Sequence, residues 1–318
     1  GFRRSGSTLV ERMLGAVPGW TNVGELVDLA RSVAPGDELC GCGSRFSRCA
    51  RWAEVGEIAF GGWSHVNLDH LASLQQAAAR QRHLPRLLGS ADRAWPALAE
   101  LRTAYAALYR AVAQVAGARV VVDASKGPAL GQALAGAPGV DLRVLNLVRD
   151  PRAVAWSWSR RVERPHATAG EQQMWRIPPY RSAAQWATLQ TEMELIARGG
   201  GRPFARLRYE DVVADPVRTL TEATRALGVP LGPDDLPDVD QGRVELGRSH
   251  GLSGNPSRFR SGLIELRGDD GRVGAMASTD RAVVTALTLP WLRAYGYGTN
   301  ARTDRRPALA AHQMRSRA

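Results

Sequence analysis

The first fourteen residues, GFRRSGSTLVERML, place two arginines and a Ser-Gly-Ser-Thr cluster directly before an amphipathic helical pattern. Gly6 lets the backbone turn tightly and approach a ligand. The first N–H groups of a helix have no partners within the helix, and with the helix dipole they form an anion site. Ser5, Ser7 and Thr8 add hydroxyl donors, and Arg4 adds a fixed positive charge. The stretch therefore predicts a phosphate-binding loop, with an ordinary helix capped by Ser or Thr as the alternative.

Polar residues also follow three β-branched runs later in the chain. ARVVVDASK (118–126), LRVLNLVRDP (142–151) and FARLRYEDV (204–212) each have the pattern of a buried strand that leads into a polar loop. Helical patterns lie between these runs, which predicts an α/β protein with a parallel sheet. Such sheets carry their chemistry at the carboxyl ends of the strands. Two of the three ends are strongly cationic, as an anion site requires.

Helical patterns must position these loops. One helix is expected from about residue 7 to 16, where Pro18 and Gly19 stop it, and a longer helical region from about 68 to 116, broken near Pro85 and Pro96. We expect a single domain over residues 1–298, with a helical insertion at about 64–117. Residues 299–318 are expected to form a frayed or loosely docked tail.

The composition of the 318 residues allows a substantial core, since 44% are hydrophobic, and it excludes collagen-like, disulfide-framework and disordered chains. The net charge of +11 has two explanations: an anionic partner, or the arginine-rich composition of a GC-rich bacterial genome. Lysine occurs only at position 126, which favours the second explanation for most of the charge and singles out Lys126.

No apolar run approaches the roughly 20 residues of a membrane span, and Glu11 and Arg12 interrupt any secretory signal. We therefore expect a cytoplasmic protein without a membrane span, although the missing initiator methionine leaves an upstream segment open. The arginines fall at strand ends and not along one helix face, which argues against nucleic acid as a partner. The sequence carries no signal for an oligomeric state.

Two other functions compete with the anion-site interpretation. An ATP-dependent small-molecule or nucleoside kinase of the P-loop type needs Gly-x-x-x-x-Gly-Lys-[Ser/Thr] and Mg²⁺. The loop at residues 3–8 is shorter and lacks that lysine, and no strand ends in the usual acidic metal ligands. This favours a phosphate loop that works without a metal. A basic nucleic-acid-binding protein is the other alternative.

Several motifs together resemble the sulfotransferases that use 3′-phosphoadenosine 5′-phosphosulfate (PAPS). RRSGST resembles their 5′-phosphosulfate loop, and LVRDPRAVAWSW resembles their 3′-phosphate motif, with Arg149 and Ser157 as its two residues. RYEDVVADP is similar to a tyrosine-bearing strand end near the nucleotide, and GNPSRFRSG to the late loop over the 3′-phosphate. NVGEL is similar to a Gly-Glu motif of bacterial and tyrosylprotein-type members. The resemblance extends from residue 1 to about 298.

The resemblance implies a P-loop-NTPase-like fold of three layers, with a central parallel sheet flanked by helices. The strand that precedes the phosphosulfate loop in the family is absent from this sequence, so the first strand is expected to be missing or truncated. The implied activity is that of a PAPS-dependent sulfotransferase, of EC 2.8.2 type. It moves the sulfuryl group to a hydroxyl of a small-molecule or carbohydrate acceptor by in-line displacement, without a metal, and leaves 3′-phosphoadenosine 5′-phosphate (PAP).

The resemblance also assigns residues to roles. Glu25 is the expected general base, Arg4 stabilises charge at the leaving oxygen, and Lys126 is a second catalytic cation. The residues expected to bind the donor are Arg3, Arg4, Ser5, Gly6, Ser7, Thr8, Arg149, Ser157, Tyr209, Arg260, Ser261 and Gly262.

Alternatives stay open for several of these residues. Glu25 also suits the start of a helix over ELVDLARSV, and His65 and His250 are rival bases. Arg152 either contacts the donor or pairs with Asp150 or a neighbouring helix, and Arg258 either contacts the donor or braces the late loop. Tryptophans 63, 156 and 158 are candidates for an acceptor pocket or for the core.

Three cysteines, Cys40, Cys42 and Cys49, cluster in one loop. As thiolates they suit a zinc site, but no fourth ligand is evident and the Cys-x-Cys spacing is short for zinc. A disulfide between Cys49 and one of the other two is therefore favoured over zinc, and buried free thiols stand as an equal alternative to both. No metal ligand is assigned.

Overall fold

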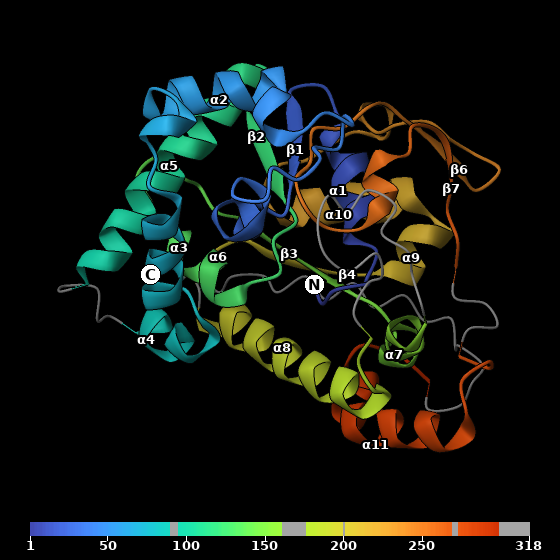
Figure 1. Cartoon of the computed structure of the whole chain (residues 1–318). Helices are drawn as coiled ribbons and strands as arrows, with labels where there is room; N and C mark the ends of the chain where they lie inside the picture. Colours follow the sequence, from blue (N-terminus) through green and yellow to red (C-terminus); the bar gives the residue numbers. More distant parts are fainter. Residues whose placement is uncertain (90–94, 161–175, 200, 269–272, 299–318) are drawn as a thin grey trace, which may run out of the picture.

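Two pairs of parallel strands lie at the centre of the structure, a computed structural model that describes residues 1–89, 95–160, 176–199, 201–268 and 273–298 (Figure 1). Strand β1 (Trp20–Gly24) pairs with β2 (Val120–Asp123), and β3 (Val144–Val148) pairs with β4 (Phe204–Arg208). The three β-branched runs thus each contain a strand. The predicted α/β class with parallel strands is confirmed, although the strands form two separate ladders and not one sheet.

The helix α1 (Ser7–Gly15) joins these two ladders and matches the helix predicted from residue 7. Its buried residues Val10, Met13 and Leu14 recur at helical spacing and give it one apolar face. That face belongs to one apolar cluster with Leu147 of β3 and Leu207 of β4, and α1 also contacts β1 and β2. The loop before α1 is therefore anchored by packing on both pairs of strands.

A helical layer precedes β2, and all of it except its first helix lies within the helical region predicted from about residue 68 to 116. It contains α2 (Ala50–Phe60), α3 (Leu68–Ala78), α4 (Leu84–Leu88) and α5 (Pro96–Ala116), and α5 packs against both α2 and α3. Pro85 and Pro96 lie in the first turns of α4 and α5, where the missing N–H breaks no helical hydrogen bond. The two prolines therefore begin new helices at the places where the pattern predicts breaks.

The remaining helices surround β3 and β4 (Figure 1). They are α6 (Pro128–Leu134), α7 (Pro151–Ser159), α8 (Pro179–Gly199), α9 (Tyr209–Ala214), α10 (Pro216–Ala226) and α11 (Ser278–Ala294). Helix α8 packs against α7 and α11. Among the described residues, no helix combines the length and apolarity that a bilayer span requires.

A small antiparallel sheet and several short turns complete the described structure. The sheet contains β5 (Val239–Asp240), β6 (Arg243–Leu246) and β7 (Gly262–Glu265). The short helical turns are η1 (Leu26–Asp28), η2 (Leu29–Val33), η3 (Phe46–Arg48), η4 (Trp63–His65), η5 (Gln81–His83), η7 (Pro233–Asp235) and η8 (Pro256–Phe259).

Three local predictions differ from the structure. The sequence did not predict β1, because the run is only five residues long and two of them, Asn22 and Gly24, are of types depleted in strands. The run 204–212 is a strand only to Arg208, and Tyr209 begins helix α9. The expected helix over 25–33 is a 3₁₀ turn followed by a π-helical turn. The predicted tail at 299–318 lies outside the described residues.

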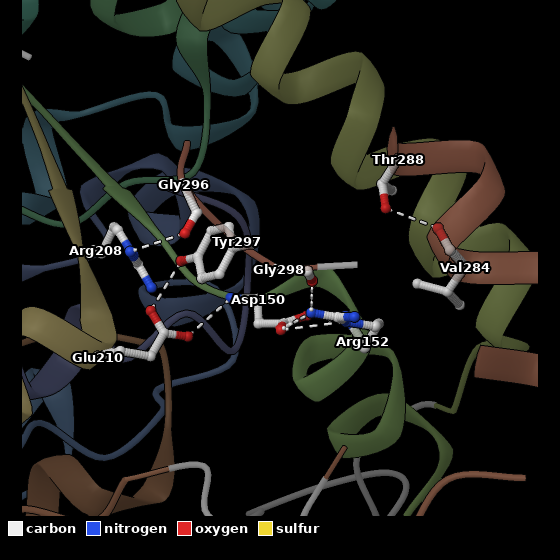
Figure 2. Close-up of polar contacts among 9 residues, drawn as sticks. All are labelled: Asp150, Arg152, Arg208, Glu210, Val284, Thr288, Gly296, Tyr297 and Gly298. Atoms are coloured by element: carbon white, nitrogen blue, oxygen red, sulfur yellow. Dashed lines mark hydrogen bonds and ion pairs between the residues drawn. The ribbon is translucent and has the colours of Figure 1, made fainter. Parts of the chain in front are cut away.

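A buried network fastens the ends of β3 and β4 to the segment that follows α11, as Figure 2 shows. Arg152 and Asp150 form an ion pair of 2.7 Å in which both side chains are 1% exposed, and Arg152 also donates to the carbonyl of Gly298. Glu210 accepts hydrogen bonds from the Asp150 amide at 3.0 Å and from the Tyr297 hydroxyl at 2.8 Å. Arg152 thus pairs with Asp150, the structural alternative weighed for it, and the network fixes the start of α7.

Candidate functional site

A large cavity opens where the loop before α1 meets the carboxyl ends of the parallel strands. Its volume is about 1620 Å³, above the roughly 300–1,000 Å³ of a typical small-molecule site. Its lining includes most of the residues that the sequence singles out: Arg3, Arg4, Gly6, Ser7, Thr8, Glu25, Lys126, Arg149, Ser157, Tyr209, Arg260 and Ser261. Ser5 and Gly262 do not line it.

The loop before α1 is a tight turn that leads into the start of the helix. Arg4 and Gly6 have positive φ angles of 66° and 86°, and the Ser5 amide between them donates to the carbonyl of Phe2 at 3.2 Å. Gly6 is the N-cap of α1, no side chain caps the helix, and its first turn has no acidic residue. A side chain at Gly6 would lie 2.3 Å from the ring of Tyr209, so this close approach requires glycine.

Two arginines meet beside this loop. The Arg149 guanidinium donates to the backbone carbonyl of Arg4 at 2.6 Å, and the Arg4 guanidinium donates to the Ser157 hydroxyl at 3.4 Å. Trp158 and Tyr209 hold the two guanidinium groups on their ring faces, each at 4.6 Å from the centroid. Burial, and secondly the charge of Arg149, lowers the pKa of Arg4. An anion between these groups would therefore stabilise both charges.

Glu25 and Lys126 form a second charged pair in the cavity. Lys126 Nζ lies 2.8 Å from Glu25 Oε1, and the side chains are 5% and 6% exposed. The other carboxylate oxygen, Oε2, is buried without a hydrogen-bond partner among the described residues. The Glu25 amide donates to the carbonyl of Leu252 at 2.8 Å, which fixes the backbone at the end of β1.

Asp123 is a site-forming residue to which the sequence analysis gave no role. It ends β2, accepts hydrogen bonds from the Tyr109 hydroxyl at 2.6 Å and from the Ser125 amide at 2.7 Å, and its burial raises its pKa. Ser125 Oγ in turn accepts from the Val27 amide at 2.9 Å. The loop that carries Lys126 is thus tied to the segment after Glu25. The sequence signal that could have pointed to Asp123 and Ser125 is the polar run, residues 123–126, at the end of β2.

The late loop around η8 also borders the cavity. Arg258 is buried and donates to the carbonyls of Gly254 and Leu39 at 3.2 and 3.3 Å, so it braces the loop as the alternative for it proposed. Arg12 of α1 donates to the carbonyls of Ser257 and Gly247. In the sequence, Arg12 stands out only as a charge that interrupts an apolar stretch, yet in the structure it ties this loop to α1.

Of the other candidate residues, Trp158 alone lines the cavity. His65 is exposed, His250 lies beside the three cysteines, and neither lines the cavity. Trp158 lines it, whereas Trp63 packs between Phe46 and Phe60, and Trp156 is also absent from the lining. The expected disulfide is not formed: the three cysteines are free, because the sulfurs of Cys42 and Cys40 each lie 3.7–3.8 Å from that of Cys49.

The chain matches a known family over most of its length. A model of the sulfotransferase family matches residues 1–233. Carbohydrate sulfotransferase 3 of Rattus norvegicus is 36% identical over 117 residues, which are 32% of this chain and 23% of that protein. The Homo sapiens protein of the same name is 33% identical over 118 residues, with the same two shares. The match therefore spans less than a quarter of the length of these curated relatives.

Two solved structures resemble the chain. One is the sulfotransferase domain from the curacin biosynthetic pathway, with a TM-score of 0.48 and 16% identity, over 91% of this chain and 94% of that one. The other is the sulfotransferase domain from the Synechococcus PCC 7002 olefin synthase. It has a TM-score of 0.49 and 19% identity, over 91% of each chain.

Proposed function

Since this chain belongs to the sulfotransferase family, we propose that it moves a sulfuryl group from PAPS to a hydroxyl of a small-molecule or carbohydrate acceptor. The observation that supports this best is one cavity in which the Arg4 and Arg149 guanidinium groups and the Glu25 carboxylate all take part in the lining. The two arginines, which would hold the anionic donor, therefore line the same cavity as Glu25, which can accept a proton.

The residues around the loop fit a donor with a 5′-phosphosulfate and a 3′-phosphate. Gly6, Ser7 and Thr8 line the cavity, and no side chain caps the amides at the start of α1. We assign Ser5 through Thr8 to the phosphosulfate and Arg149 and Ser157 to the 3′-phosphate. Arg3, Tyr209 and the segment Arg260, Ser261 and Gly262 complete the proposed donor contacts.

Glu25 is the proposed general base. The bound donor supplies an activated sulfuryl group, and the acceptor hydroxyl must lose its proton as it attacks. Lys126 holds one oxygen of the Glu25 carboxylate, and the second oxygen has no partner among the described residues. An anchored carboxylate with one available oxygen is suited to take that proton in a fixed direction.

Arg4 and Lys126 are the proposed electrostatic contributors. Arginine does not release its proton at neutral pH, so Arg4 acts by charge and hydrogen bonding toward the oxygen that accumulates negative charge in an in-line displacement. Lys126 holds the Glu25 carboxylate in place through their ion pair. It also adds a second positive charge to the lining of the cavity. In this proposal the described side chains, and no metal, supply the charge stabilisation.

The cavity also has space for an acceptor beside the donor, because its volume exceeds that of a typical single-ligand site. The matched relatives are carbohydrate sulfotransferases by name, which supports a hydroxylated acceptor without specifying it. We propose a cytoplasmic location on the grounds given by the sequence.

Ligand-induced changes in thermal stability test the donor class. The full chain is heated with PAP, with ATP and Mg²⁺, and with duplex DNA. A ligand at about 100 times its Kd stabilises the folded state by about 2.7 kcal/mol, so PAP is expected to raise the midpoint by several degrees. A larger shift with ATP and Mg²⁺ would favour a P-loop kinase, and a shift with DNA alone would favour nucleic-acid binding.

Product analysis tests the transfer itself. The chain is incubated with PAPS and a mixture of hydroxylated metabolites, and mass spectrometry searches for products heavier by one sulfuryl group. Formation of such products together with PAP supports the proposal. PAP binding with no transfer to any phenol, sugar or alcohol class would contradict the proposed acceptor chemistry.

A further inference from the structure

Four metal-binding side chains from distant parts of the sequence meet away from the proposed catalytic cavity. Cys40 and Cys42 lie in the loop before η3, Cys49 is the N-cap of α2, and His250 lies between β6 and η8. One ligand atom of each of the four lies within 4.8 Å of those of the other three. Cys49 and His250 are 201 positions apart, so only the tertiary structure reveals the fourth member of the set.

Four of the six distances among the ligand atoms are close to the edges of a tetrahedron around a metal, and the other two, from Cys42 to Cys40 and to His250, are no longer than 4.8 Å. Cys49 Sγ lies 3.7 Å from Cys40 Sγ and 3.8 Å from Cys42 Sγ, and His250 Nδ1 lies 3.3 and 3.8 Å from the sulfurs of Cys49 and Cys40. Zinc with Zn–S of about 2.3 Å and Zn–N of about 2.0 Å separates its tetrahedral ligands by roughly 3.5–3.8 Å. A disulfide would need about 2.05 Å between two sulfurs.

The backbone around the four side chains is held in place independently of any metal. The Cys40 amide donates to the carbonyl of Ser44 at 2.8 Å, which closes a tight turn around Cys42. The Gly41 amide donates to the carbonyl of Gly251 at 3.0 Å, and the Trp52 indole donates to the carbonyl of His250 at 2.9 Å. The turn around Cys42 and the helix α2 are therefore both fastened to the segment at His250 and Gly251, so the four ligand atoms converge without a chain rearrangement.

We propose that Cys40, Cys42, Cys49 and His250 bind one Zn²⁺ in a closed tetrahedral site. Three thiolates and an imidazole favour zinc over the oxygen-preferring Mg²⁺, Ca²⁺ and Mn²⁺. Four protein ligands leave no position for a substrate, which is typical of a structural site and not of a catalytic one. Cys40 and Cys49 are buried and Cys42 is half-buried, so the metal is shielded from solvent on most sides.

The site has a consequence for the proposed catalytic cavity. His250 is followed by Gly251 and Leu252, and Leu252 pairs with the end of β1: its amide donates to Val23 and its carbonyl accepts from Glu25, both at 2.8 Å. A metal that fastens His250 to the start of α2 therefore holds the backbone against which Glu25 is positioned. The zinc is a structural clamp in this proposal and takes no part in the transfer.

Metal analysis of the full chain tests the site without reference to nucleotide or turnover. The chain is purified under reducing conditions without added metal or chelator, and zinc is measured by elemental mass spectrometry. About one zinc per chain is expected, and Cys42→Ser is expected to lower it by about tenfold because one of four ligands is lost. The exposed His65→Ala is the matched control and should retain the full zinc content.

Cobalt substitution keeps the proposal testable if Cys42→Ser fails to fold. Co²⁺ added to the metal-stripped wild type should give one equivalent of tetrahedral d–d bands and thiolate charge-transfer bands, which zinc then removes. A wild type that holds iron in place of zinc would overturn the proposal, as would one that takes up neither zinc nor cobalt with these bands. An intact disulfide within residues 40–49 of the native, anaerobically handled protein would also overturn it.

Discussion

Lys126 Nζ and Glu25 Oε1 lie 2.8 Å apart in a buried ion pair that joins residues 101 positions apart in the sequence. Glu25 follows β1 and Lys126 follows β2, and the parallel pairing of these strands brings both ends to the same edge. The only lysine of the chain is thus the partner of the carboxylate that we propose as the general base. Removing either member leaves the other as a buried charge.

This ion pair should show strong energetic coupling. Lys126→Met leaves a buried carboxylate, and breaking one member of such a pair typically costs about 3–5 kcal/mol. The double variant Lys126→Met with Glu25→Gln buries no charge and should regain much of that loss. Urea unfolding of the wild type, both single variants and the double variant measures the coupling. Effects that simply add would show that the two side chains do not interact in solution.

Glu25→Gln is expected to lower kcat by about 10²–10⁴, the usual contribution of a general base. Binding of PAP, measured by its effect on the unfolding temperature, should be unchanged because the donor contacts remain. Glu38→Gln is the matched control, since Glu38 lines the same cavity and has no assigned role. The prediction is contradicted if Glu25→Gln and Glu38→Gln have equal turnover with the acceptor that the product screen identifies.

Ser157→Ala and Arg149→Lys should weaken PAP binding. A hydrogen bond to a charged group is worth about 1.5–3 kcal/mol, which corresponds to roughly 10- to 150-fold in Kd. Lysine keeps the charge at 149 but not the planar fork, so the substitution is not conservative there. Isothermal titration with PAP measures both losses, and the exposed Arg225→Ala is the control. Wild-type affinity in both variants would place the 3′-phosphate elsewhere.

Stability should fall as pH rises because of Glu11. Its carboxyl is buried, which raises its pKa from 4.5 to about 8, and one of its oxygens has no hydrogen-bond partner among the described residues. Lys126 and Arg12 oppose this shift, whereas Glu25 and Asp123 add to it. The folded state thus holds this proton more tightly than the unfolded state. The stabilisation is complete below about pH 4.5 and is lost as pH rises toward about 8.

Glu11→Gln tests this pH dependence because the amide keeps the shape and cannot ionise. The free energy of unfolding of the variant minus that of the wild type should increase from pH 5 to pH 8 and then level off. Taking this difference removes the other titrating groups from the comparison. A difference that does not change with pH would mean that Glu11 is ionised throughout.

Gly24→Ala should lower the free energy of unfolding by more than the strain of a positive φ angle at a non-glycine residue explains. Gly24 has a φ of 77°, and a Cβ atom there would lie 2.1 Å from the carbonyl oxygen of Leu252. Gly117 also has a positive φ, 57°, but nothing lies within 4 Å of its Cβ position. Gly117→Ala should therefore cost about 1 kcal/mol and Gly24→Ala clearly more. Equal losses in urea unfolding would contradict the close approach of Leu252 to β1.

The sequence by itself determined the local elements and the kinds of residue at the site. Helix α1, β2, β3 and β4 were predicted because their apolar spacing and turn residues are local signals. The motifs around Arg4, Arg149 and Glu25 indicated a family that the match over residues 1–233 then confirmed. Such motifs consist of neighbours along the chain, so no structure is needed to find them.

The tertiary structure alone decided which distant residues meet. Strand β1 exists because β2 pairs with it, and Glu25 and Lys126 form an ion pair because that pairing is parallel. His250 joins three cysteines that precede it by about 200 positions, and Arg152 donates to the carbonyl of Gly298, which lies 146 positions later. Contacts of this kind depend on chain topology and on the packing of buried charges, and no local pattern encodes them.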